Sequence, residues 1–266
     1  STSLLLHGDG ANSSTTFTDE VGNTVSARGG AHISTAQSKF GGASVYFDGV
    51  DSALEGGSIG DFDFLHDGTS WTFEAWVKID SFTPENVFIG TASGSTVNTG
   101  IYLAASPSTG IIYFQVYRGG SGTTVFNGGV GTFPSDGAWH HFALSVDFSV
   151  ATPTATGFID GVGATALTKN AYTPSTANSS QPLTVGTYGV ATPGAFFSGY
   201  MDDIRITKGE ALYTADFTPP TAPLEAVVSG RILCPMPTIE SMPNGHAVCE
   251  ITSPAPRAYA NPDVIV

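Results

Sequence analysis

The feature that most constrains this chain is a succession of short blocks in which apolar and polar residues alternate, separated by clusters of Gly, Asn, Asp, Ser and Pro. Alternation with a period of two places successive side chains on opposite faces of an extended strand, and the intervening residues favour turns. The blocks with this pattern are residues 4–6, 44–47, 71–78, 111–118, 139–147, 154–159, 183–187 and 200–207. No segment has a convincing long helical period, so the sequence predicts an all-β fold of two packed antiparallel sheets.

Two of these blocks show which face should be buried. In residues 71–78, one parity holds Trp71, Phe73, Ala75 and Val77, and this face is expected to form core. In residues 139–147, His140 shares a parity with Phe142, Leu144 and Val146, whereas His141 lies on the other. Because neighbours on a strand point to opposite faces, the two histidines are not expected to chelate one ion.

Composition and charge exclude several function classes. The chain has 23 acidic and 9 basic residues and a formal net charge of -14, and the basic residues form no cluster, so nucleic acid is not an expected partner. No apolar run approaches the ~20 residues of a membrane-spanning helix, and the N-terminal segment lacks the features of a signal peptide. We therefore expect that the protein does not insert into a membrane and that it is made in a cytoplasm.

The composition of the sequence changes near residue 225, where prolines become frequent. Prolines at this density are incompatible with a central sheet, although the segment is rich in Val and Ile that need cover. We therefore expect two parts: a sandwich over residues 1–224 and, over residues 225–266, an arm or small appended module that serves assembly. Cys234 and Cys249 both fall in the second part, and the sequence leaves open whether they are bridged.

Six strings resemble those of a known family, in the same order: LLLHGDG at 4–10, SKFGGASVYFDG at 38–49, TFEAWV at 72–77, GAWHHFAL at 137–144, FIDG at 158–161 and YMDDIRITKGEALYTADFTPPTAP at 200–223. Residues 4–224 thus resemble laminin-G-like domains of the concanavalin A-like superfamily. The last string is similar to the ending of such domains in tailed-bacteriophage structural proteins.

The resemblance implies a jelly-roll sandwich that takes part in carbohydrate or protein recognition. It also implies a virion protein that faces a host surface glycan. The resemblance does not extend to residues 225–266, whose prolines and apolar residues predict an arm that contacts other virion proteins and sister copies in a homo-oligomer. Two functions stay open for the sandwich: a receptor- or glycan-binding module, and a decoration protein that clamps neighbouring subunits. A free-standing lectin is a further alternative.

Catalysis is not expected, although the same superfamily contains laminarinase-type glycoside hydrolases. Retaining hydrolysis needs two carboxylates ~5 to 5.5 Å apart, which alternate acids on one strand would supply. Glu74 stands alone in its block, and Asp61 and Asp63 lie in a Gly-flanked, loop-like stretch. A pair of acids assembled from distant segments is the remaining enzymatic alternative.

A structural calcium ion is the one cofactor that the sequence suggests. By parity, Asp202 groups with Ile204 and Ile206, and a carboxylate buried with them needs a partner. The resemblance implies a calcium site at this position, held by Asp202 and backbone carbonyls. Asp9 and Asp48, each in an Asp-Gly pair, are further candidate ligands by residue type. The alternative is that Asp202 accepts hydrogen bonds without an ion.

Aromatic residues offer many surfaces for a sugar ring, and the candidates are Trp76, Tyr102, Tyr113, Tyr117, Tyr172 and Tyr188. Most of them are expected to serve packing. Tyr172 and Tyr188 lie in loop-like sequence, where recognition residues concentrate, and are the predicted ligand-binding residues.

Overall fold

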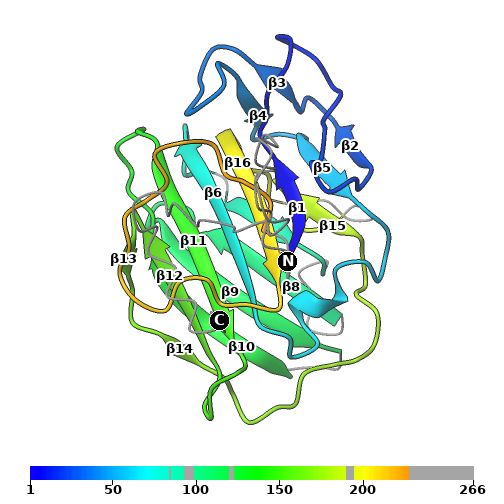
Figure 1. Ribbon diagram of the computed structural model, residues 1–266, viewed down its shortest axis with the longest axis vertical. Helices are drawn as coiled ribbons and strands as arrows, with labels where there is room; N and C mark the ends of the chain where they lie inside the picture. The colour runs from blue at the N-terminus through cyan, green and yellow to red at the C-terminus, as the bar shows by residue number, and fades with distance from the viewer. Residues whose placement is uncertain (84, 93–98, 120–122, 190–194, 228–266) are drawn as a thin grey trace, which may run out of the picture. The chain divides into compact units, whose positions relative to one another are not determined.

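The computed structural model describes residues 1–83, 85–92, 99–119, 123–189 and 195–227 (Figure 1). These residues form β-strands joined by loops and a single 3-10 turn, η1 (Asp63–Leu65), which confirms the all-β prediction. The arm or module expected at 225–266 falls, from residue 228 onward, outside the described residues, as do both cysteines. No helix in the described part of the chain is long and apolar enough to cross a membrane.

The strands form two antiparallel sheets, as predicted (Figure 1). The order in sheet A is β13 (Val162–Gly163), β12 (Thr154–Ile159), β11 (His140–Asp147), β6 (Trp71–Ile79), β16 (Ser198–Lys208), β4 (Ser44–Asp48) and β3 (His32–Ser34). In the same sheet, β1 (Thr2–Leu6) pairs with β16, and β14 (Leu167–Thr168) pairs with β12. The order in sheet B is β10 (Thr124–Thr132), β9 (Ile111–Arg118), β8 (Thr99–Ala105), β7 (Asn86–Gly90), β15 (Leu183–Val185), β5 (Ala53–Gly56) and β2 (Val25–Arg28).

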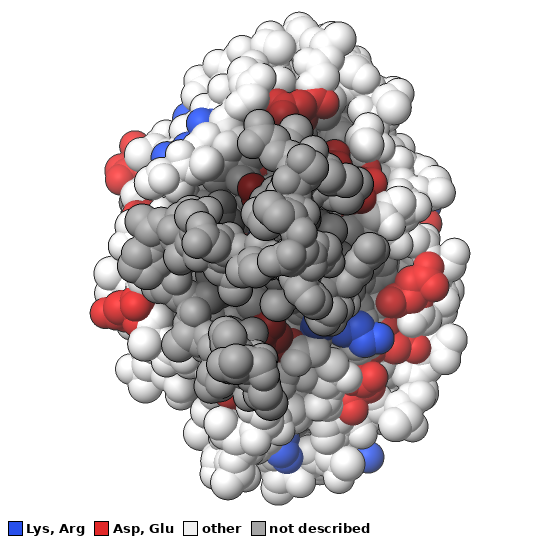
Figure 2. Space-filling model, in the orientation of Figure 1, with Lys and Arg blue, Asp and Glu red and all other residues white. Residues whose placement is uncertain are grey.

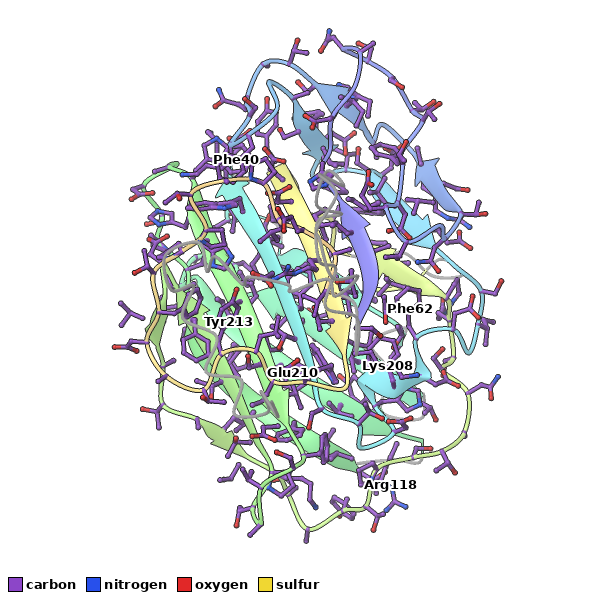
Figure 3. All side chains as sticks on the ribbon, viewed as in Figure 1. Phe40, Phe62, Arg118, Lys208, Glu210 and Tyr213 are labelled. Carbon is purple, nitrogen blue, oxygen red and sulfur yellow. The ribbon has the colours of Figure 1, made fainter. Side chains whose placement is uncertain are left out.

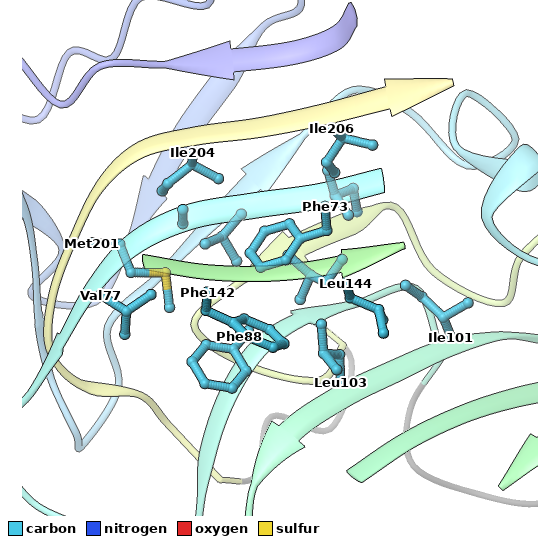
Figure 4. Close-up of a cluster of buried hydrophobic side chains, with 14 of the residues drawn as sticks. Phe73, Val77, Phe88, Ile101, Leu103, Phe142, Leu144, Met201, Ile204 and Ile206 are labelled. Atoms are coloured by element: carbon cyan, nitrogen blue, oxygen red, sulfur yellow. The ribbon is translucent and has the colours of Figure 1, made fainter. Parts of the chain in front are cut away.

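The hydrophobic core lies between the two sheets. Phe73 and Phe142 project from neighbouring strands of sheet A, and Phe88 and Leu103 project from sheet B to meet them (Figure 4). The four residues expected to face inward from residues 71–78 all belong to this core. Parity therefore predicted the buried face of the central strand correctly.

Strand β16 contains a bulge that reverses its parity. Met201 pairs with Val77 and Asp202 with Trp76, but Arg205 pairs with Glu74, so β16 carries one residue more than β6 between these pairs. Asp203 adopts a positive φ of 50° at this point. As a result Met201, Ile204 and Ile206 all face the core, whereas Asp202 lies with Trp76 on the outer face of sheet A. The prediction that Asp202 shares a face with Ile204 and Ile206 is therefore wrong, because a period of two does not survive a bulge.

Residues 209–227, called the strap below, run across the outer face of sheet A (Figure 1). Outward-facing side chains of the sheet hold the strap by its backbone: the Thr72 hydroxyl accepts from Leu212 N–H at 2.8 Å, and the Ser145 hydroxyl accepts from Tyr213 N–H at 3.1 Å. The Tyr213 ring stacks on Phe217 at 3.7 Å. The strap covers the outer face of the central strands, so β6 and β11 are buried on both faces.

The compact unit runs to Val227, past the boundary expected at 224. Val227 is joined to the first strand, since its carbonyl accepts from Thr2 N–H at 2.6 Å and its N–H donates to the Thr2 hydroxyl at 2.6 Å. Figure 2 shows acidic side chains scattered over the described part of the displayed face, with fewer basic side chains among them.

Candidate functional site

A row of residues in register crosses the outer face of sheet B, and most of its members are polar or aromatic. The register pairs Glu55 of β5 with Thr184 of β15, Thr184 with Gly90 of β7, Gly90 with Tyr102 of β8, Tyr102 with Gln115 of β9, and Gln115 with Asn127 of β10. Strand pairing alone therefore aligns residues from six segments of the chain on one surface.

At one end of this face the ring of Tyr113 stands exposed. Its exposed fraction is 39%, and its partners in register are Ala104 on β8 and Gly129 on β10. Gly129 has no side chain and is exposed, so the ring is flanked by open surface on that side, whereas Ala104 on the other side is buried. We call Tyr113, Gln115 and Asn127 the platform.

The polar members of the platform are fixed by a hydrogen-bonded relay. Tyr117 donates its hydroxyl to Gln115 Oε1 at 2.5 Å, and Gln115 Nε2 donates to Asn127 Oδ1 at 2.8 Å. The relay engages exposed Asn127 through its oxygen and leaves its NH2 group available to a ligand. An aromatic ring beside oriented amides is the arrangement that pairs an apolar surface with polar specificity.

The two predicted ligand-binding tyrosines lie in different surroundings. Tyr188 packs its ring against Tyr102 at 5.7 Å and so lies over the middle of the outer face of sheet B. Burial raises the pKa of Tyr102, so its hydroxyl stays neutral and its ring serves as a packed support for Tyr188. Tyr172 is 41% exposed and lies 5.8 Å from the guanidinium of Arg118, at the end of the molecule opposite to Phe40 (Figure 3).

In the sequence, Tyr113 is one of several aromatic candidates and is not among the predicted ligand-binding residues. Its signal is the alternation in residues 111–118, which places Tyr113, Gln115 and Tyr117 on the face away from the core. The glycine that leaves the surface open on one side of Tyr113 comes from another strand. Only the register reveals it.

The carboxylate of Asp202 is buried on the outer face of sheet A. Its Oδ2 accepts from the backbone N–H groups of Lys39 at 2.7 Å and Phe40 at 3.0 Å, whereas its Oδ1 is buried without a hydrogen-bond partner. Burial raises the pKa of Asp202 to about 7. A protonated carboxyl or a bound cation would each relieve the cost of the orphan oxygen.

The other two predicted calcium ligands are occupied differently. Asp48 Oδ1 accepts from the N–H groups of Val50, Asp51 and Ser52, which closes a turn. The Asp9 carboxylate packs directly on Gly41. A Cβ atom at position 41 would lie only 1.9 Å from Asp9 Oδ1. No three His, Cys, Asp or Glu side chains of the described residues gather as a metal site. A calcium ion at Asp202 would therefore be held by Oδ1 of that residue and by backbone carbonyls. The calcium site stays a prediction.

Glu74 is the centre of a buried polar cluster beneath the strap. Its Oε1 accepts from Arg205 Nε at 2.9 Å, and its Oε2 accepts from the Tyr213 hydroxyl at 2.7 Å and pairs with His141 Nε2 at 3.2 Å. Burial alone would raise the pKa of Glu74, but the hydrogen bond with His141 and the charge of Arg205 lower it to about 2. Glu74 is therefore a charged and inaccessible side chain that joins β6 to β11, to β16 and to the strap.

The adjacent histidines point to opposite faces, as expected. His141 is fully buried on the outer face of sheet A, beside Trp76 at 5.4 Å between ring centroids. His140 lies near the surface, where Asp160 and Asp136 contact its two ring nitrogens at 2.6 and 3.0 Å. Trp76 is only 6% exposed, although its parity suggested exposure, because Lys39 covers its ring at 3.6 Å.

The family model of the concanavalin A-like lectin/glucanases superfamily (Laminin_G_3) matches residues 48–213, more than half of the chain. The chain belongs to this superfamily. The match covers the strands that form the platform and most of the core.

Solved structures show the same concanavalin A-like fold at low sequence identity. One is domain 4 of AbnA, an extracellular GH43 arabinanase from Geobacillus stearothermophilus, in complex with arabinotriose; its TM-score is 0.52 at 17% identity, covering 78% of this chain and 92% of that domain. Another is botulinum neurotoxin type C, whose cell entry depends on two ganglioside molecules, with a TM-score of 0.55 at 12% identity. That match covers 85% of this chain, which spans about half (49%) of the toxin chain. The comparison with curated proteins gave no match.

Proposed function

We propose that this chain is a non-enzymatic carbohydrate-binding module carried on the surface of a bacteriophage virion. The observation that carries carbohydrate binding is the platform: the exposed ring of Tyr113 between Ala104 and Gly129, with Gln115 one step along the strand. A sugar ring has an apolar C–H face that packs on an aromatic ring, and its hydroxyl groups pair with amides such as those of Gln115 and Asn127. The arabinotriose in the AbnA domain and the ganglioside dependence of the toxin support sugars as the first ligands to try.

Binding is tested by titrating arabinotriose, a ganglioside oligosaccharide and host surface polysaccharide into the wild-type protein and two variants. We expect Tyr113→Ala to lower the affinity for the sugar by about tenfold, or about 1.4 kcal/mol, because the stacking surface is lost. Tyr172→Ala is the matched comparison, since that ring is equally exposed but lies at the end of β9. If affinity falls with Tyr172→Ala and not with Tyr113→Ala, the binding site is the loop at Tyr172 instead of the platform.

The virion role rests on a different observation, the similarity of residues 200–223 to the endings of phage structural domains. In this proposal residues 228–266, together with the strap that leads to them, attach the module to other virion proteins and to sister copies, while the sandwich faces a host surface glycan. Localising the protein in an intact particle by immunogold labelling tests the role. A label that is absent from purified particles would contradict it.

A glycoside hydrolase is the enzymatic rival, and the position of Glu74 argues against it. The carboxylate is fully buried beneath the strap and ion-paired with Arg205, so it has no access to a glycosidic bond. Asp61 and Asp63 instead accept backbone N–H groups, from Ser58 and Ser179. We expect no release of reducing ends from β-glucans, laminarin or host polysaccharide. If the wild-type protein releases reducing ends and Glu74→Gln abolishes that release, the hydrolase interpretation would be restored.

A further inference from the structure

A hollow of about 590 Å³ opens at the other end of the same face of sheet B, over β2 and β5. Its floor is built from Ser26 and Glu55, which pair directly across the two strands, and from Arg28, whose guanidinium contacts the Glu55 carboxylate. Ser58 and Asp61 form one wall, and Asn23 and Thr24 form the other. Polar side chains therefore line the hollow.

Both walls are held in place by carboxylates. Asp61 Oδ2 accepts from Ser58 N–H at 2.7 Å and closes the loop at residues 57–62. Asp19 Oδ2 accepts from both Asn23 N–H groups, at 2.8 Å from the backbone and 2.5 Å from the side chain, and Asp19 Oδ1 anchors the same loop to Leu5 of β1. The hollow is thus formed before a ligand arrives, which lowers the entropic cost of binding.

The charges of the lining define the class of ligand. Arg28 contributes one positive charge and Glu55 and Asp61 contribute two negative ones, so the lining is net negative on a chain whose net charge is already -14. Such a surface repels carboxylate and phosphate groups. Its carboxylate oxygens accept from hydroxyl groups, while the guanidinium and the Ser26 hydroxyl donate. We propose that the hollow is a second sugar-binding subsite, selective for a neutral, hydroxyl-rich sugar unit.

This subsite deepens the proposed function and rests on it for the nature of the ligand. Four strand spacings, from β9 through β8, β7 and β15 to β5, separate the platform from the hollow, which is about 19 Å. Tyr188 lies between them, with its backbone over Gly90 of β7 and its ring on Tyr102. An extended neutral glycan laid across the strands therefore contacts the platform, Tyr188 and the hollow in turn.

Occupation of the hollow is tested on the full chain by amide NMR shifts. Arabinose, glucose and galactose serve as neutral probes, and glucuronate is the anionic counterpart of glucose. We expect neutral probes to shift the amides of residues 23–28 and 55–61, and glucuronate to leave them unchanged. Ser26→Trp should fill the hollow and abolish those shifts, whereas Val162→Trp, at an equally exposed strand position on sheet A, should not.

The length of the glycan tests the link between the two sites. Arabinohexaose should bind about tenfold more tightly than arabinotriose, and Ser26→Trp should remove that advantage without weakening arabinotriose. Missing shifts at 23–28 and 55–61 with every neutral probe, or shifts as large with glucuronate as with glucose, would overturn the subsite. Shifts there without any at residues 113–117 would instead overturn the platform and leave the hollow standing, so the two failures are distinct.

Discussion

The orphan oxygen of Asp202 makes the stability of the protein depend on pH. Burial raises the pKa of this carboxyl to about 7, whereas in an unfolded chain it is about 3.9. Between these values the folded protein keeps a proton that the unfolded chain has lost, so the free energy of unfolding falls as the pH rises through this window and levels off above it.

Asp202→Asn should remove this dependence, because an amide carries no charge. From pH 4 to pH 8 wild type should lose up to about 4 kcal/mol relative to the variant, the free energy that corresponds to the gap between the two pKa values. Urea unfolding of both proteins at several pH values measures the difference. Parallel profiles would show that Asp202 is charged throughout.

Calcium would change this result, which makes the ion testable at the same residue. If an ion binds the Asp202 Oδ1, wild type should gain about 2.7 kcal/mol at a hundredfold excess of calcium over its Kd, and EDTA should lower the melting temperature. Asp202→Asn should not respond to either. A wild-type melt that EDTA leaves unchanged would favour the protonated, hydrogen-bonded carboxyl.

The same residues mark the limit of prediction from sequence. Parity placed Phe73 and Val77 in the core, because both sides of that strand keep a strict alternation. It failed at Asp202, because nothing in the letters Asp202-Asp203 announces a positive φ and an extra residue. Tyr113 could be recognised as outward-facing, but the open surface on one side of it depends on Gly129, which strand pairing alone brings next to it.

At the scale of elements, the strap and sheet A are joined by buried charge. Arg205 contacts the Glu74 carboxylate and donates from Nη1 to the Glu225 carbonyl at 2.7 Å, so one side chain links the strand to the end of the strap. This link could not be predicted from the sequence, because residues 209–227 lack alternation and dock through the outward side chains of other strands.

Arg205→Met should destabilise the protein by about 3 to 5 kcal/mol, since it leaves the Glu74 carboxylate buried without its cation. The double variant Arg205→Met/Glu74→Leu should recover much of that loss. Lys78→Met, which removes a solvent-exposed partner of Asp80, is the control and should cost about 1 kcal/mol or less. A double variant less stable than the sum of its single changes would show that the pair is not the source of the cost.

At the scale of the whole molecule, the sandwich unit should fold without the residues that follow it. A chain of residues 1–227 should be folded and should fail to join the particle or to oligomerise, whereas residues 1–224 should melt at a lower temperature. The shorter chain loses the Glu225 carbonyl that Arg205 binds and both bonds between Val227 and Thr2. Thermal melts and particle incorporation measure the two effects. Normal incorporation of 1–227 would show that attachment lies in the sandwich itself.

The hydrogen bonds between Thr2 and Val227 bring the two ends of the sandwich unit next to each other. A unit of this kind can be spliced into an exposed turn of an unrelated carrier protein, because the carrier chain leaves and resumes its course at nearly one point. Neither the core between the sheets nor the platform on β9 and β10 includes the two ends. The fold therefore keeps the platform accessible when the unit is inserted into a carrier protein.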